Sequence, residues 1–135
     1  MVKKVSAKKF DASGYKRFIT VAENFGDAAS LAEEFEYYNS AGVLYILSAI
    51  AFADALTIKL AGKKSSGDNH YNVIHLMEDA VPSRNINKKA VDCFKSLIDQ
   101  KNLVSYTGDV FNKKDILRIK RFYVVFKQWV GALLN

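Results

Sequence analysis

Residues that interrupt helices are scarce in this sequence. Among 135 residues there are one proline and seven glycines, the two residue types that the interior of an α-helix tolerates least. Their scarcity favours long helices. Cysteine is equally scarce, because Cys93 is the only one. A single cysteine excludes an intramolecular disulfide and any metal site built on cysteine pairs, and it indicates a reducing compartment.

Long apolar runs are also lacking. The longest, Ala41 to Ala53, has 13 residues, includes Gly42 and Ser48, and is followed by Asp54, whereas a membrane-spanning helix needs about 20 residues. The basic start of the chain is not followed by the apolar core of a secretion signal. We therefore expect a cytoplasmic protein that does not contact a membrane. It should consist of a flexible basic segment at residues 1–12 and one domain over residues 13–135.

Positive charge is absent from a long stretch. No Lys or Arg occurs from Phe18 to Ile58, which contains six acidic residues, whereas from Arg84 to the end of the sequence 11 basic residues accompany 4 acidic ones. The formal net charge of +6 therefore conceals a basic C-terminal half. Such asymmetry steers a polyanion toward one face, or pairs the acidic side of one subunit with the basic side of another. Solvated helix faces also produce charge runs, and this alternative stays open.

Five segments carry apolar residues at three- and four-residue spacing, which predicts helices. These segments are residues 13–38, 39–61, 70–80, 83–104 and 112–134. The second is apolar nearly all round, so we expect it to be the central helix. No strand pattern of useful length is present, and residues 63–69 are expected to form a loop. The predicted fold is all-α, an antiparallel bundle of four to five helices.

Local signals predict where several helices begin, end or weaken. Gly62 should end the second helix and Ser83 should cap the fourth. Asn112, with Asp115 three residues later, resembles a capping box for the last helix. Gly26 is expected to be a soft point within the first helix.

The last predicted helix has an apolar face and a cationic face when its residues are placed at 100° intervals. The apolar face comprises Ile116, Ile119, Phe122, Tyr123, Phe126, Trp129, Val130 and Leu133. The cationic side comprises Lys113, Lys120 and Lys127 along one line and Lys114, Arg118 and Arg121 beside it. These six residues are candidate nucleic-acid-binding residues, because such a stripe suits phosphates. The inward aromatic residues argue against a stacking platform for bases.

The segment Lys101 to Tyr106, Lys-Asn-Leu-Val-Ser-Tyr, lies near the end of the fourth predicted helix. Its spacing resembles the motif of nucleolytic HEPN domains, small all-helical domains that carry an Arg, often followed by Asn, and a His four to six residues later. The order of other features is also similar to that family: an Ala-rich helix ending in Lys-Leu-Ala-Gly at residues 59–62, a loop leading to His70, and Ile-His-Leu-Met at residues 74–77. The resemblance implies a helical bundle that dimerises with the motif helices facing each other. In active members it implies metal-independent RNA cleavage.

Through this resemblance Lys101, Asn102 and Tyr106 become the candidate catalytic residues. A tyrosine with a pKa of about 10 is a poor base near neutral pH, and a lysine lacks the two-pronged donor geometry of arginine. We therefore expect weak cleavage or none. Tyr106 should be a hydrogen-bonded structural residue, and Lys101 remains able to contact a phosphate as a point charge.

The two histidines do not predict a metal site. His70 and His75 are five residues apart, which places them about 140° apart on a helix, and zinc sites favour a spacing of four. His75 and Asp79 have that spacing, but two ligands alone are insufficient. The segment Lys63 to Gly67 lacks the Walker pattern of phosphate-binding loops. We expect no metal and no cofactor.

Three functions compete. The first is a HEPN-like helical module, non-catalytic or weakly active and homodimeric, that binds RNA, other nucleic acid or a nucleotide through its basic C-terminal face. The second is a metal-independent RNase of toxin type that uses Lys101, Asn102 and Tyr106. The third is a homodimeric protein-interaction domain in which the acidic first helix pairs with a basic surface, in a second copy or in another protein.

Overall fold

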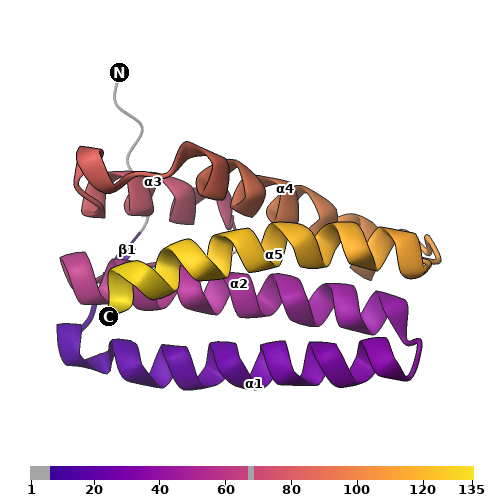
Figure 1. Cartoon of the computed structure of the whole chain (residues 1–135). Coiled ribbons are helices and arrows are strands. Elements are labelled where there is room, and N and C mark those ends of the chain that lie inside the picture. Colours follow the sequence, from indigo (N-terminus) through magenta and orange to yellow (C-terminus); the bar gives the residue numbers. More distant parts are fainter. Residues whose placement is uncertain (1–6, 67–68) are drawn as a thin grey trace.

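A computed structural model describes residues 7–66 and 69–135 of the chain. These residues form five α-helices, which confirms the predicted all-α bundle (Figure 1). The helices are α1 (Tyr15–Glu34), α2 (Tyr38–Ala61), α3 (Tyr71–Ala80), α4 (Lys88–Ser105) and α5 (Lys113–Leu134). Two short strands, β1 (Ala7–Lys9) and β2 (Lys63–Ser65), and two 3-10 turns at Ala12–Gly14 and Ser83–Asn85 complete the described elements.

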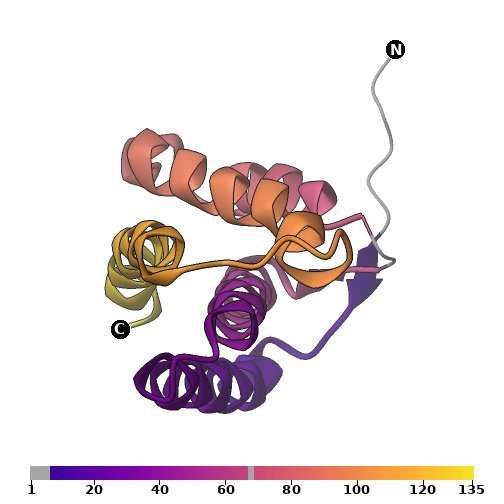
Figure 2. The ribbon, with the colours of Figure 1, turned by 90° about the vertical axis from the view of Figure 1, so that its right-hand side faces the viewer.

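Helix α2 is the centre of the bundle, as its apolar surface predicts. Seen from the end of the bundle, α1, α5, α4 and α3 surround it (Figure 2). Small residues let the neighbours approach, and at Gly42 a Cβ atom would lie 2.8 Å from Val104 Cγ2 and 3.3 Å from Ile116 Cδ1. By length and composition α2 is apolar enough to cross a membrane, but 83% of the relevant window is buried within the bundle. That burial is typical of the core helix of a soluble protein.

The ends of α2 and α5 follow the predicted capping signals. Gly62 ends α2 in the left-handed conformation, with φ of 64°. Asn112 and Asp115 form the capping box of α5, in which Asp115 N donates to Asn112 Oδ1 at 3.0 Å and Asn112 N donates to Asp115 Oδ2 at 2.9 Å. Both signals are local in sequence, so they predict these boundaries reliably.

Two other helix boundaries were predicted wrongly. Helix α1 ends at Glu34 rather than at residue 38, because Glu36 adopts a left-handed conformation, with φ of 63°, in the turn before α2. No glycine or proline marks that turn. Ser83 does not cap α4, since it belongs to a 3-10 turn; Asn87 caps α4 by accepting a hydrogen bond from Ala90 N at 3.1 Å.

The predicted absence of strands and the loop at residues 63–69 were also wrong in part. Strand β2 pairs antiparallel with β1, Ala7 opposite Ser65 and Lys9 opposite Lys63. The pairing continues in a hydrogen bond from Phe10 N to Gly62 O at 2.8 Å. Residues 7–9, which belong to the basic segment predicted to be flexible, are therefore paired with the segment that follows α2. Residues 1–6 and 67–68 lie outside the described residues.

The side chain of Asn39, in the first turn of α2, holds the connection between α4 and α5. Its Nδ2 donates to Val104 O at 3.0 Å and to Asp109 O at 2.8 Å, and its Oδ1 accepts from Phe111 N at 2.9 Å. The connection contains the predicted turn, in which Gly108 has a φ of 80°. One amide thus fixes the end of the bundle that carries the Lys101 to Tyr106 segment.

Candidate nucleic-acid interface

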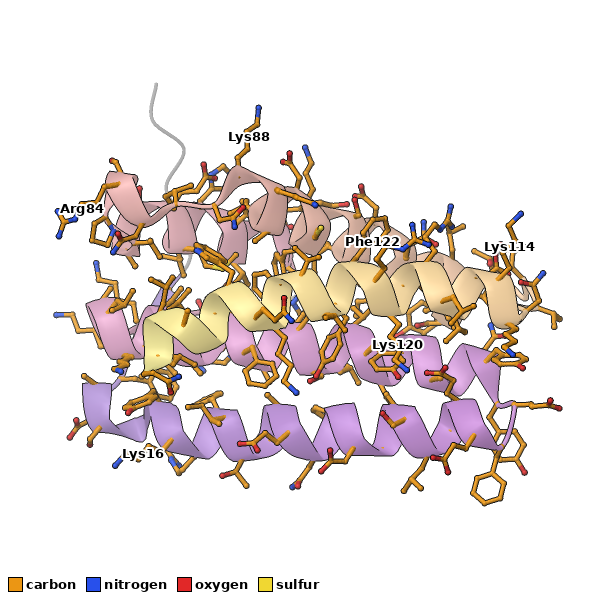
Figure 3. All side chains as sticks on the ribbon, viewed as in Figure 1. Lys16, Arg84, Lys88, Lys114, Lys120 and Phe122 are labelled. Carbon is orange, nitrogen blue, oxygen red and sulfur yellow. The ribbon has the colours of Figure 1, made fainter. Side chains whose placement is uncertain are left out.

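The six candidate cations of α5 do not form one surface. Lys113, Lys120 and Lys127 face α1, and Lys120 Nζ lies 3.3 Å from Glu33 Oε1. Figure 3 shows Lys120 between the ribbons of α5 and α1. Two adjoining hollows of about 410 and 420 Å³ follow this junction, and both are lined by Ser30 and Lys120. Because the acidic residues of α1 line the same hollows, this half of the predicted stripe is opposed by negative charge within the chain.

The acidic lining of these hollows comes entirely from α1 and the turn after it. It comprises Asp27, Glu33, Glu34 and Glu36. Lys127 is placed differently, with its Nζ 5.8 Å from the ring centroids of both Phe52 and Tyr123. A cation over aromatic faces gains electrostatic stabilisation there. Lys120, through Glu33 of α1, and Lys127, through Phe52 of α2, therefore help to hold α5 against its neighbours.

A hydrogen-bonded core lies beneath this junction. Ser48 Oγ donates to Ala22 O at 2.6 Å and lies 2.9 Å from Tyr123 OH, so the tyrosine hydroxyl donates to the serine. Gly26 makes this arrangement possible, because a Cβ atom there would lie 2.5 Å from Tyr123 OH. Helix α1 runs through Gly26 without a break. The expected soft point is instead a position of close packing.

Beside it, Tyr45 OH donates to Glu33 Oε1 at 2.7 Å. Burial, together with this hydrogen bond, raises the pKa of Tyr45 to about 12. Burial also raises the pKa of Tyr123, and the nearby carboxylates Asp27 and Glu23 add to the effect. Both hydroxyls therefore stay protonated near neutral pH and act as structural donors.

The remaining cations of α5 face away from the bundle, as do two lysines of α4. We call this set the outer cationic surface; it comprises Lys88, Lys95, Lys114, Arg118 and Arg121. All five side chains are exposed, and within the described residues none of them forms an ion pair. Figure 3 shows Lys88 and Lys114 pointing away from the body of the protein. Helices α4 and α5 pack directly on each other, with ring centroids of Phe94 and Phe126 4.6 Å apart.

The three candidate catalytic residues lie together at the end of α4 but line different hollows. Lys101 and Asn102 border a hollow of about 140 Å³ against α3, whereas Tyr106 borders one of about 470 Å³ against the start of α2. Tyr106 is 77% exposed, and its hydroxyl has no hydrogen-bond partner among the described residues. The prediction of a hydrogen-bonded structural Tyr106 was therefore wrong. The residue ends the helix, where its ring is free of the core.

The hollow beside Lys101 contains residues that the sequence did not single out together. Asn69, His70 and Tyr71, from the start of α3, face Asp99 of α4 across it. Tyr71 OH donates to Asp99 Oδ1, and this hydrogen bond raises the pKa of Tyr71. The first amides of α3 are already occupied, since Tyr71 N donates to Asn69 Oδ1 at 3.1 Å and Val73 N to His70 O at 3.1 Å. The site is polar, but the helix terminus offers it no vacant amide at these positions.

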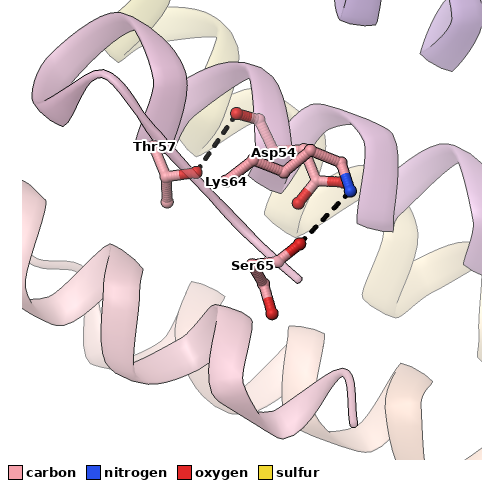
Figure 4. A network of polar contacts seen from close by, with 4 residues as sticks. All are labelled: Asp54, Thr57, Lys64 and Ser65. Carbon is pink, nitrogen blue, oxygen red and sulfur yellow. Dashed lines mark hydrogen bonds and ion pairs between the residues drawn. The ribbon is translucent and has the colours of Figure 1, made fainter. Parts of the chain in front are cut away.

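A buried carboxylate lies at the other side of the bundle, near the strands (Figure 4). Asp54 is 6% exposed, and its Oδ2 lies 3.8 Å from Lys64 Nζ, which also donates to Ser65 O at 3.3 Å. Burial raises the pKa of Asp54 to about 6, although Lys64 opposes the shift. Asp54 Oδ1 and Ser65 Oγ have no hydrogen-bond partner within the described part of the chain. Sequence periodicity places Asp54 on an apolar helix but gives no signal of its partner.

No arrangement of three or more His, Cys, Asp or Glu residues suited to a metal ion occurs within residues 7–66 and 69–135. The described fold and surface define an all-α helical bundle with a two-stranded ribbon and a cationic outer face. No protein-family model and no curated protein matches the sequence.

Proposed function

We propose that this protein is a non-catalytic, HEPN-like helical module that binds nucleic acid through the outer cationic surface. The observation that carries the proposal is the set of five exposed cations on α4 and α5, none of which forms an ion pair with a described carboxylate. When such cations contact a phosphate backbone, they displace the counterions condensed on it. The release of these counterions into solution favours association. Homodimerisation and a cytoplasmic location belong to the same proposal.

The proposal and the sequence-based interpretation assign binding to different cations. Lys120 is paired with Glu33 and Lys127 lies over aromatic rings, so binding through them would require those contacts to be given up. Cleavage is not part of the proposal, because Tyr106 is a poor base and Lys101 lacks the two-pronged donor geometry of arginine.

The experiment is fluorescence anisotropy with a labelled single-stranded RNA over a range of salt concentrations. Each phosphate contact contributes about 0.7 to the slope of log affinity against log salt concentration for a single strand. Arg121→Gln should lower the slope by about that amount. Lys120→Gln removes the same charge one residue away and should leave the slope unchanged. Equal effects of the two variants, or no binding by the unaltered protein at low salt, would refute the proposal.

A further inference from the structure

An apolar hollow with an exposed aromatic wall lies at the end of the bundle, next to the Lys101 to Tyr106 segment. It has a volume of about 470 Å³ and is bordered by residues of α2 and of the end of α4. The lining residues are Asn39, Ser40, Val43, Leu44, Val104, Ser105 and Tyr106. Small-molecule sites in proteins have volumes of roughly 300 to 1,000 Å³ and are predominantly apolar with a few polar groups. The hollow has the volume and composition of such a site, but it is shallow and open to solvent, so it suits a ligand that lies against the surface.

The chemistry of the lining narrows the choice of ligand. Val43, Leu44 and Val104 offer an apolar floor, and the ring of Tyr106, 77% exposed, offers a flat aromatic face. Ser40 and Ser105 have exposed hydroxyls with no hydrogen-bond partner among the described residues. A flat heteroaromatic ring with polar edges suits the apolar floor, the aromatic face and the hydroxyls. Such a ring stacks on the tyrosine and presents its polar edge to the serines.

A cation beside the aromatic wall points to a nucleotide rather than an uncharged ring. Lys101 Nζ lies 6.0 Å from the centroid of the Tyr106 ring, and no carboxylate among the described residues pairs with it. The amide of Asn39 is already used in three hydrogen bonds. It therefore holds the wall of the hollow in place and leaves recognition to the tyrosine, the serines and the lysine.

We infer that this hollow accepts one unstacked nucleobase of a single-stranded nucleic acid, with Tyr106 as the stacking surface and Lys101 beside the attached phosphate. The inference rests on the proposed function and adds to it a preference for single strands over duplex, because bases in a duplex are stacked on each other and are not available to the hollow. It also gives Tyr106 a role that needs no proton transfer. The sequence-based argument against a stacking platform concerned the aromatic residues of α5, and Tyr106 lies outside that helix.

The test compares the affinities of single-stranded and duplex oligonucleotides of equal length at one salt concentration. Removing an aromatic partner of a stacked base weakens binding by between about 5-fold and 150-fold. Tyr106→Ala should therefore weaken single-strand binding by that factor and leave duplex binding unchanged, and Tyr106→Phe should bind like the unaltered protein. Tyr37→Ala is the matched control, because Tyr37 is 65% exposed but does not border the hollow.

A direct readout comes from Tyr106→Trp in a Trp129→Phe background, in which the new tryptophan is the only one. Stacking of a base should quench its fluorescence, and the oligonucleotide should do so at a lower concentration than adenosine monophosphate. An unchanged single-strand affinity in Tyr106→Ala would overturn the inference, as would equal potency of the mononucleotide. Absence of all nucleic-acid binding would instead refute the proposed function, so the two failures are distinguishable.

Discussion

Gly26 provides the sharpest test of how the bundle is packed. A Cβ atom at this position would lie 2.5 Å from Tyr123 OH and 3.3 Å from Ser48 Oγ. Tyr123 cannot simply swing away, since it is 5% exposed and its ring centroid lies 5.0 Å from that of Tyr45. Gly26→Ala must therefore displace the ring and break its hydrogen bond to Ser48.

The expected loss of stability follows from three contributions. Overpacking a core costs about 1 to 3 kcal/mol, and leaving a buried hydroxyl unpaired costs about 1 to 3 kcal/mol. Replacing glycine by alanine within a helix stabilises the helix by about 1 kcal/mol, which opposes these two losses. We therefore expect Gly26→Ala to lower the free energy of unfolding by about 1 to 5 kcal/mol. Gly131→Ala in α5 is the matched control, because nothing lies within 4 Å of the added Cβ, and it should stabilise the protein by about 0.5 to 1 kcal/mol.

The assay is urea unfolding followed through Trp129, which is the single tryptophan and is 9% exposed. The double variant Gly26→Ala, Tyr123→Phe lacks the oxygen that the new Cβ meets, so it should be more stable than Gly26→Ala alone. A double-mutant cycle then gives a coupling energy between positions 26 and 123 of about 1 kcal/mol or more. If Gly26→Ala stabilised the protein as Gly131→Ala should, α1 would not approach α5 as closely as described.

Two further predictions concern the polar side chains of Asp54 and Asn39. The pKa of Asp54 is raised from 3.8 to about 6, so the folded state binds a proton more tightly than the unfolded state. The free energy of unfolding should therefore fall as the pH rises from about 4 to above 6, by about 3 kcal/mol at most. Urea unfolding at about pH 4.5 and about pH 7.5 measures this difference, and Asp54→Asn should abolish it. If the variant showed the same difference, another group would be responsible for the titration. Asn39→Ala removes three hydrogen bonds from the connection between α4 and α5, so it should cost about 2 to 4 kcal/mol in the same assay. Ser40→Ala, at an exposed neighbour, should cost almost nothing, and equal losses would contradict the role of the amide.

The parts of the fold that were predictable from sequence depend on local signals. The apolar surface of α2, the Gly62 stop and the Asn112 capping box each involve residues within one or two helical turns. The turn at Glu36 was missed because a glutamate rarely adopts a positive φ. The two-stranded sheet of β1 and β2 was missed because strands of three residues give no periodicity. Its paired residues Lys9 and Lys63 are also far apart in the sequence.

The candidate site shows the same division. Helical periodicity correctly grouped Lys113, Lys120 and Lys127 on one line, but only the position of α1 shows that this line meets Glu33. Spacing alone placed Lys101 and Tyr106 in one motif, and Lys101 Nζ does lie 6.0 Å from the Tyr106 ring centroid, but spacing could not show that the two residues border different hollows. The exposure of Tyr106 follows from its position as the C-cap of α4, a tertiary outcome that composition does not determine.

The small ribbon beside α2 has a consequence for solubility. A two-stranded sheet leaves unpaired backbone groups along both outer edges, and such edges invite strands from other molecules. Here the paired residues include the exposed Lys8, Lys9 and Lys63, and lysines on an edge strand oppose the approach of another strand by charge and by the cost of burying an ammonium group. Lys63, in a segment that reads as a loop in the sequence, and Lys8 and Lys9 on the opposite strand therefore protect the protein against edge-to-edge aggregation.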